Sequence, residues 1–175
     1  MKIGLVSNDF EFKLKDGISR YSYELYKYLR RKNDVFLYTF SEAGGFLSNT
    51  IRGAKRLIGM KISEEVDVVH LLYPNAAFPI TRSPVVETWH DADLFNRYFS
   101  SPLSPNFYHW LGVVLPAIRN TRRADGLIYV SEETEKEVEG TLPRILGKAH
   151  AVIPNGIDDA FIKARISRRA EMQDF

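Results

Sequence analysis

Cysteine is absent from the 175-residue sequence, and this absence narrows the chemistry available to the chain. Without cysteine there is no disulfide framework, thiolate nucleophile or zinc-finger site, which agrees with a reducing, cytoplasmic setting. Long apolar runs are also missing. The opening run at 3–7 gives way at once to Asn8 and Asp9, so it is too short for a signal peptide or a membrane span. We interpret it as a first strand.

A strong excess of charge of one sign is missing as well, since the formal net charge is only +2. Such a small excess does not favour a nucleic-acid partner, which requires a concentrated basic face. The 45% hydrophobic and 26% charged residues are typical of a globular protein, and the length suits one domain.

Short apolar runs alternate with amphipathic helical patterns along the chain. The runs predict strands at 3–7, 35–40, 66–72, 84–89, 126–130 and 149–153, and the patterns predict helices at 18–32, 46–60, 107–121 and 132–139. This alternation indicates an α/β, Rossmann-like fold with a parallel sheet and helices on both faces. Ligands in such folds bind outside the carboxyl ends of the strands, so we searched the loops there.

The loop after the first strand ends in Asp16 and Gly17 and leads into a helix that carries Ser19 and Tyr21. A glycine at this point can bring backbone N–H groups and a helix N-terminus close to a phosphate. The simpler interpretation is that Asp16 or Gly17 only caps the helix. Neither a Walker loop nor a G-x-G-x-x-G motif occurs, which disfavours P-loop nucleotidases and nicotinamide enzymes.

The loop after the strand at 84–89 is the best candidate site, because it places His90 and Asp91 at the end of that strand. A histidine there can hydrogen-bond a hydroxyl-rich ligand or exchange a proton near neutral pH, and an adjacent aspartate can fix its tautomer. The alternative is an aspartate cap beside a structural histidine. The other three histidines are distant in the sequence, so no metal site is expected.

Two later strand ends also carry polar residues. Ser131 follows the strand at 126–130 and is the expected N-cap of the next helix. Asn155 and Gly156 form a turn after the strand at 149–153, and by themselves they indicate only a turn.

In this order the loops resemble the N-terminal domain of a family of retaining glycosyltransferases, group 1, family four. That family includes glycogen synthases, sucrose synthases and phosphatidylinositol mannosyltransferases. The matching segments reach to about residue 161 and are 16–21, 24–25, 66–70, 88–91, 128–131 and 152–158. The resemblance implies one half of a GT-B fold, in which two Rossmann-like domains face each other and the first holds the acceptor.

The resemblance also implies roles for the loop residues. Gly17 would approach the donor diphosphate, and His90, with Asp91, would act on the transferred sugar as the catalytic pair. Donor-phosphate or acceptor binding would fall to Asp16, Gly17, Ser19, Tyr21, Ser131, Asn155 and Gly156. Many family members have paired glycines where this chain has Asp16 and Gly17. The implied reaction moves a hexose from a nucleoside diphosphate sugar to a saccharide or lipid-linked acceptor, with no cofactor and no metal ion.

The resemblance further predicts how the domains are organised. Residues 1–157 would form the N-terminal domain and 158–175 the start of a linker or a tail, while the nucleotide-sugar-binding domain is absent from this sequence. We therefore expect the acceptor-binding half of an enzyme, inactive by itself. The alternative is a stand-alone Rossmann-like binding module that completes an active site with a separate subunit.

The predicted helix at 46–60 is a candidate membrane contact. Its basic residues Arg52, Lys55 and Arg56 lie opposite an apolar face, a pattern that suits anionic lipid and a lipid-linked acceptor. An ordinary surface helix has the same pattern. On the first interpretation the protein would be cytoplasmic and peripheral on the inner face of the membrane.

Overall fold

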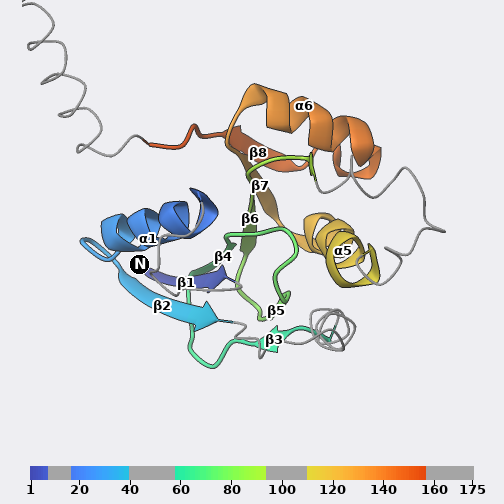
Figure 1. Cartoon of the computed structure of the whole chain (residues 1–175). Helices are drawn as coiled ribbons and strands as arrows, with labels where there is room; N and C mark the ends of the chain where they lie inside the picture. The colour runs from blue at the N-terminus through green and yellow to red at the C-terminus, as the bar shows by residue number, and fades with distance from the viewer. Residues whose placement is uncertain (8–16, 40–57, 94–109, 157–175) are drawn as a thin grey trace, which may run out of the picture.

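The computed structural model describes residues 1–7, 17–39, 58–93 and 110–156, which form a parallel sheet with helices packed on it (Figure 1). Six strands follow the order β2, β1, β4, β6, β7, β8, and each neighbouring pair is parallel. The strands are β1 (Lys2–Ser7), β2 (Asp34–Thr39), β4 (Val68–Leu71), β6 (Val85–Trp89), β7 (Gly126–Tyr129) and β8 (Ala149–Val152). The helices are α1 (Gly17–Leu29), α5 (Leu115–Arg123) and α6 (Glu132–Thr141), with a π-helical turn at Trp110–Val114 and a 3-10 turn at Pro143–Ile145.

The helices cover both faces of the sheet, as the sequence predicts. Helix α1 packs on Ile3 and Leu5 of β1, whereas α5 and α6 pack on the opposite face against Trp89, Leu127 and Tyr129. Figure 1 shows α1 on one side of the sheet and α5 and α6 on the other. The predicted α/β, Rossmann-like class is confirmed.

The strand order reverses between β1 and β4, and this reversal positions a ligand site. From β1 the chain passes through α1 to β2 on one side, and all later strands add on the other side, beginning with β4. In open parallel sheets such a reversal opens a crevice at the carboxyl ends of the strands, where ligands bind. The ends of β1, β4 and β6 and the start of α1 meet at this edge of the sheet.

The predicted helix at 46–60 is wrong at its end, and residues 46–57 lie outside the described part of the chain. Gly59 has a φ of +94°, and a side chain there would bring Cβ within 2.8 Å of the Phe78 carbonyl oxygen. Because this left-handed conformation ends helical geometry, Met60 instead opens β3 (Met60–Lys61), which pairs with β5 (Pro79–Ile80). The sequence analysis missed this small second sheet.

Two buried polar side chains tie α5 to the sheet. The Asn120 amide donates to the carbonyl oxygens of Pro74 and Ala76, at 2.8 and 2.7 Å, and so fixes the chain that leaves β4. The Thr121 hydroxyl donates to Glu87 at 2.6 Å, and burial raises the pKa of that carboxyl to about 8.

A helix that spans a membrane must have both sufficient length and sufficient hydropathy. None of the helices in the described part of the chain meets both requirements.

Candidate functional site

Three polar residues of the central strands share the face of the sheet that α1 covers. Successive side chains on a strand point to opposite faces, and β4 pairs with β6 so that His70 is opposite Val86. His70, Thr88 and His90 therefore lie on the same face as Leu5, which is registered with His70 and packs under α1. Strand register alone brings an imidazole, a hydroxyl and a second imidazole to the carboxyl edge.

His90 is fixed by contacts from helix α1 and from the chain that leaves β4. Its Nε2 atom lies 3.2 Å from the Leu72 carbonyl oxygen, just past the end of β4. The ring meets the Tyr21 ring of α1 edge to face, with centroids 4.6 Å apart, and Tyr73 lies at 6.3 Å. Since a carbonyl only accepts hydrogen bonds, Nε2 carries the proton of the neutral ring and Nδ1 keeps the lone pair.

The surroundings of His90 favour its neutral form. Burial lowers the pKa of His90, and the Leu72 carbonyl and the charge of Asp91 oppose this only in part. Asp91 itself is exposed. A neutral imidazole with a fixed Nε2–H presents Nδ1 as an acceptor for a ligand hydroxyl group.

The side chains of Tyr21, Thr88 and His70 form a hydrogen-bonded network next to His90. The Thr88 hydroxyl lies 2.7 Å from Nε2 of His70 and also hydrogen-bonds Tyr21. Burial lowers the pKa of His70 to about 4, with a further contribution from His90, and burial raises the pKa of Tyr21. The network of Tyr21, Thr88 and His70 is therefore uncharged near neutral pH, and it holds the Tyr21 ring against His90.

The start of α1 adds an open helix N-terminus beside these residues. Gly17 begins α1 and is exposed, and no heavy atom of the described residues lies within 4 Å of the position that a Cβ would take. Tyr21, one turn later, places this helix end near His90. Ser19 is half-buried in the same turn, whereas Asp16 lies outside the described residues.

The structure does not bring the later strand-end residues into this group. Ser131 accepts a hydrogen bond from the Thr134 amide at 3.1 Å, so it caps α6 as the sequence predicts. Asn155 and Gly156 are exposed and follow β8, two strands away from β6. Ser131 follows β7, and Asn155 and Gly156 follow β8, so these residues also lie at the carboxyl edge of the sheet. His90, in contrast, follows β6. The predicted membrane residues Arg52, Lys55 and Arg56 lie outside the described part of the chain.

Apart from Tyr21, the residues that orient His90 were not predicted from the sequence. Leu72 and Tyr73 come from the chain leaving β4, and His70 and Thr88 come from strand interiors. Two polar residues on one face of apolar strands are a signal that could have identified His70 and Thr88. No local pattern identifies a backbone carbonyl such as that of Leu72.

Fold and site together define a Rossmann-like domain with a neutral, hydrogen-bonding site at the point where the strand order reverses. The family model described as Glycosyltransferase Family 4 matches residues 15–161, most of the chain. The chain belongs to this family, and the predicted membership of the glycosyltransferases is confirmed. A comparison with curated proteins finds no match.

Proposed function

We propose that the chain is the acceptor-side half of a retaining GT-B glycosyltransferase. It would move a hexose from a nucleoside diphosphate sugar to a saccharide or lipid-linked acceptor. The observation that carries the proposal is the position of His90, held by the Leu72 carbonyl and the Tyr21 ring near the N-terminus of α1. In this proposal, the Nδ1 atom of His90 accepts a hydrogen bond from a sugar hydroxyl, and the nearby N-terminus of α1 binds an anion.

In this proposal His90 orients the transferred sugar. Its Nδ1 atom accepts a hydrogen bond from a hexose hydroxyl group, and because the ring is already fixed, little orientational entropy is lost on binding. Asp91 acts through its charge, which favours the protonated ring and so partly offsets the effect of burial on the His90 pKa. The network of Tyr21, Thr88 and His70 positions the ring and does not itself take part in the reaction.

The N-terminus of α1 supports the departure of the diphosphate. Helix N-termini present backbone N–H groups and a partial positive charge to anions. As the bond between the anomeric carbon and the diphosphate oxygen breaks, negative charge grows on the leaving group. The acceptor oxygen bonds to the same carbon on the same face, and its proton passes to the leaving diphosphate. Gly17 would contact this group, while Asp16 and Ser19 would contribute to donor or acceptor binding, and Asn155 and Gly156 mark the strand end before the second domain.

Calorimetric titration with UDP- and GDP-sugars tests the proposal on two proteins. One is the 175-residue chain, and the other is a longer chain that includes any coding sequence downstream. Binding and hexose transfer by the longer chain alone would support an acceptor-side half. Tight donor binding by the 175-residue chain alone would overturn that assignment. If no downstream domain is encoded, and activity requires a separate subunit, the stand-alone binding module is the better description.

We also propose that the protein is cytoplasmic and binds anionic membrane surfaces through Arg52, Lys55 and Arg56. Ile58, two residues after Arg56, is 72% exposed and borders a groove with Ile80, Arg119 and Arg123. An exposed apolar side chain beside basic ones suits a lipid interface. Flotation with vesicles of phosphatidylcholine, with and without phosphatidylserine, tests this. Vesicle binding that does not change with phosphatidylserine, or when Arg52, Lys55 and Arg56 are all replaced by Gln, would contradict the membrane proposal. K136Q, at an exposed lysine of α6, is the control variant.

A further inference from the structure

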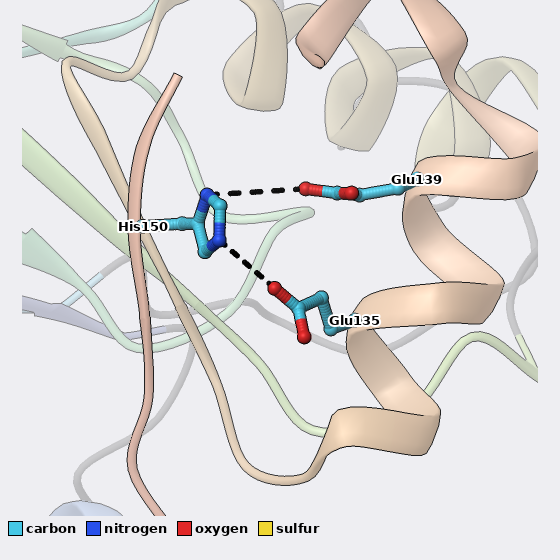
Figure 2. Close-up of side chains that lie close together, drawn as sticks. All are labelled: Glu135, Glu139 and His150. Atoms are coloured by element: carbon cyan, nitrogen blue, oxygen red, sulfur yellow. Dashed lines mark ion pairs between the residues drawn. The ribbon is translucent and has the colours of Figure 1, made fainter. Parts of the chain in front are cut away.

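A second histidine cluster lies on the other face of the sheet, between α6 and β8. Glu135 and Glu139 are four residues apart on α6, so their side chains lie on one side of the helix, and His150 of β8 points between them (Figure 2). His150 Nε2 is 2.9 Å from a Glu135 oxygen, and Nδ1 is 4.0 Å from a Glu139 oxygen. One ligand atom from each of the three residues lies within 4.8 Å of the others.

The contacts of His150 decide which ring nitrogen is available. Nδ1 lies 3.1 Å from the carbonyl oxygen of Lys148, which can only accept a hydrogen bond. A proton on Nδ1 leaves the lone pair of a neutral ring on Nε2, and this atom faces the Glu135 carboxylate. The contact is favourable when Nε2 carries a second proton or binds a metal ion, and the experiments below distinguish these two cases. A backbone carbonyl that holds the far nitrogen is also the usual arrangement for a metal-binding histidine.

Tyr129 of β7 lies next to this cluster. Its side chain is 0% exposed, and its ring lies 6.0 Å from the His150 ring. Its hydroxyl interacts with the Glu139 carboxylate, although not in standard hydrogen-bond geometry, and Glu135 lies nearby. Carboxylates that bind metal ions are commonly oriented by such an outer hydroxyl. Tyr129 therefore supports the position of Glu139 in the cluster.

We propose that Glu135, Glu139 and Nε2 of His150 bind one divalent transition-metal ion of the zinc type, with water as the fourth ligand. One imidazole and two carboxylates suit Zn²⁺ or Co²⁺, whereas Mg²⁺ and Ca²⁺ require six or more oxygen ligands. The two carboxylates balance the charge of the ion. Side-chain exposures of 39% for His150 and 21% for each glutamate leave a path from solvent.

Such an ion would join β8 to α6. Strand β8 is the last strand of the sheet and pairs with β7, and it leads directly to the turn at Asn155 and Gly156. A metal bond at His150 would fix the position from which the chain leaves the sheet. The role is structural and separate from the sugar site, so it holds whether or not the proposed transfer reaction is correct.

Calorimetric titration of the tag-free 175-residue chain with ZnCl₂ tests the site. We expect one saturable site per chain, and at least about 10-fold weaker binding in both H150N and E139Q, because each removes a ligand. E137Q on the same helix is the matched control, since Glu137 is exposed and outside the cluster, and its affinity should equal that of the unchanged chain. Excess Mg²⁺ should not displace the zinc.

Two further readouts separate an ion site from a simple ion pair between histidine and glutamate. Co²⁺ should give the intense visible absorption of a four-coordinate ion in the unchanged chain and in E137Q but not in H150N. Zinc should raise the thermal midpoint of the same two proteins only, with circular dichroism confirming that all variants fold. Absence of saturable zinc binding, or equal affinity in H150N, would overturn the proposal.

Discussion

The two faces of the sheet place histidine in opposite environments. On the α1 face, His90 and His70 lie among tyrosines, a threonine and a backbone carbonyl, and burial keeps both rings neutral near pH 7. On the α6 face, His150 lies half-exposed between two carboxylates. The first environment suits hydrogen bonds to an uncharged ligand, and the second suits a cation. Neighbours and burial, more than residue type, therefore decide which chemistry a histidine performs.

The largest expected effect is on the transfer reaction, in an assay of the complete enzyme with its donor. H90A should lower kcat/KM about 100-fold, because a preorganised contact to the transferred sugar is lost. H150N should change kcat/KM less than about 2-fold, because His150 lies on the other face, which the proposed reaction does not use. Equal losses of kcat/KM in H90A and H150N would contradict a functional difference between the two faces of the sheet.

The acid stability of the chain should depend on His70. The pKa of His70 falls from 6.5 to about 4 on folding, so between these values the unfolded chain binds a proton that the folded chain does not. The free energy of unfolding therefore falls as pH falls from 6.5 toward 4, by up to about 3 kcal/mol from this group.

Urea unfolding of the unchanged chain and of H70Q across this pH range measures the contribution. H70Q should have the shallower acid slope. Glu87 acts in the opposite direction, because its raised pKa makes the folded chain bind the extra proton, but its contribution cancels in the comparison. Identical slopes would show that His70 is not held neutral.

A smaller effect should follow from removal of the hydroxyl that links the α1-face network. T88V leaves Nε2 of His70 and the Tyr21 hydroxyl without their shared partner, which should lower the free energy of unfolding by about 2 kcal/mol. T141V is the matched control. It removes a hydroxyl bonded to a helix carbonyl near solvent and should cost about 0.5 kcal/mol or less. A T88V loss no greater than that of T141V would show that the network contributes little.

The smallest effect should come from the cap of α6. S131A removes the acceptor for the Thr134 amide and should cost about 1 kcal/mol, whereas S131D should retain most of the stability. In two-dimensional NMR the ring signals of His150 should shift in S131A more than those of His90, because among the described histidines it is His150 that is paired with side chains of α6. Shifts at both histidines would mean that the two faces are coupled.

Local patterns predicted the fold because strands and helices depend on them. Alternating apolar and polar segments gave the α/β class, and Ser131 was recognised as a cap because capping involves residues only three apart. The end of the helix at 46–60 was wrong because Gly59 adopts its left-handed conformation against Phe78, a contact that no window around Gly59 contains. The small sheet of β3 and β5 depends on the same long-range approach.

The site was predicted only where it coincides with a strand end. His90 and Gly17 follow from the rule that ligands bind at carboxyl ends, and their proposed roles remain predictions. The partners of His90 depend on register and on the course of the chain after β4, which Asn120 fixes from 44 and 46 residues away. The cluster at His150 was missed because strand β8 returns beside α6, so residues that are distant in the sequence meet in space.

The position of β1 within the sheet has a consequence for how the chain opens. β1 is paired on both sides, over six residues with β2 and four with β4, whereas β8 is paired over four residues with β7 at the edge of the described sheet. Amide hydrogens of β8 should therefore exchange with solvent through local opening, while those of β1 should exchange only when the whole domain unfolds. Of these two strands, the first described strand should therefore exchange slowly and the last described strand quickly.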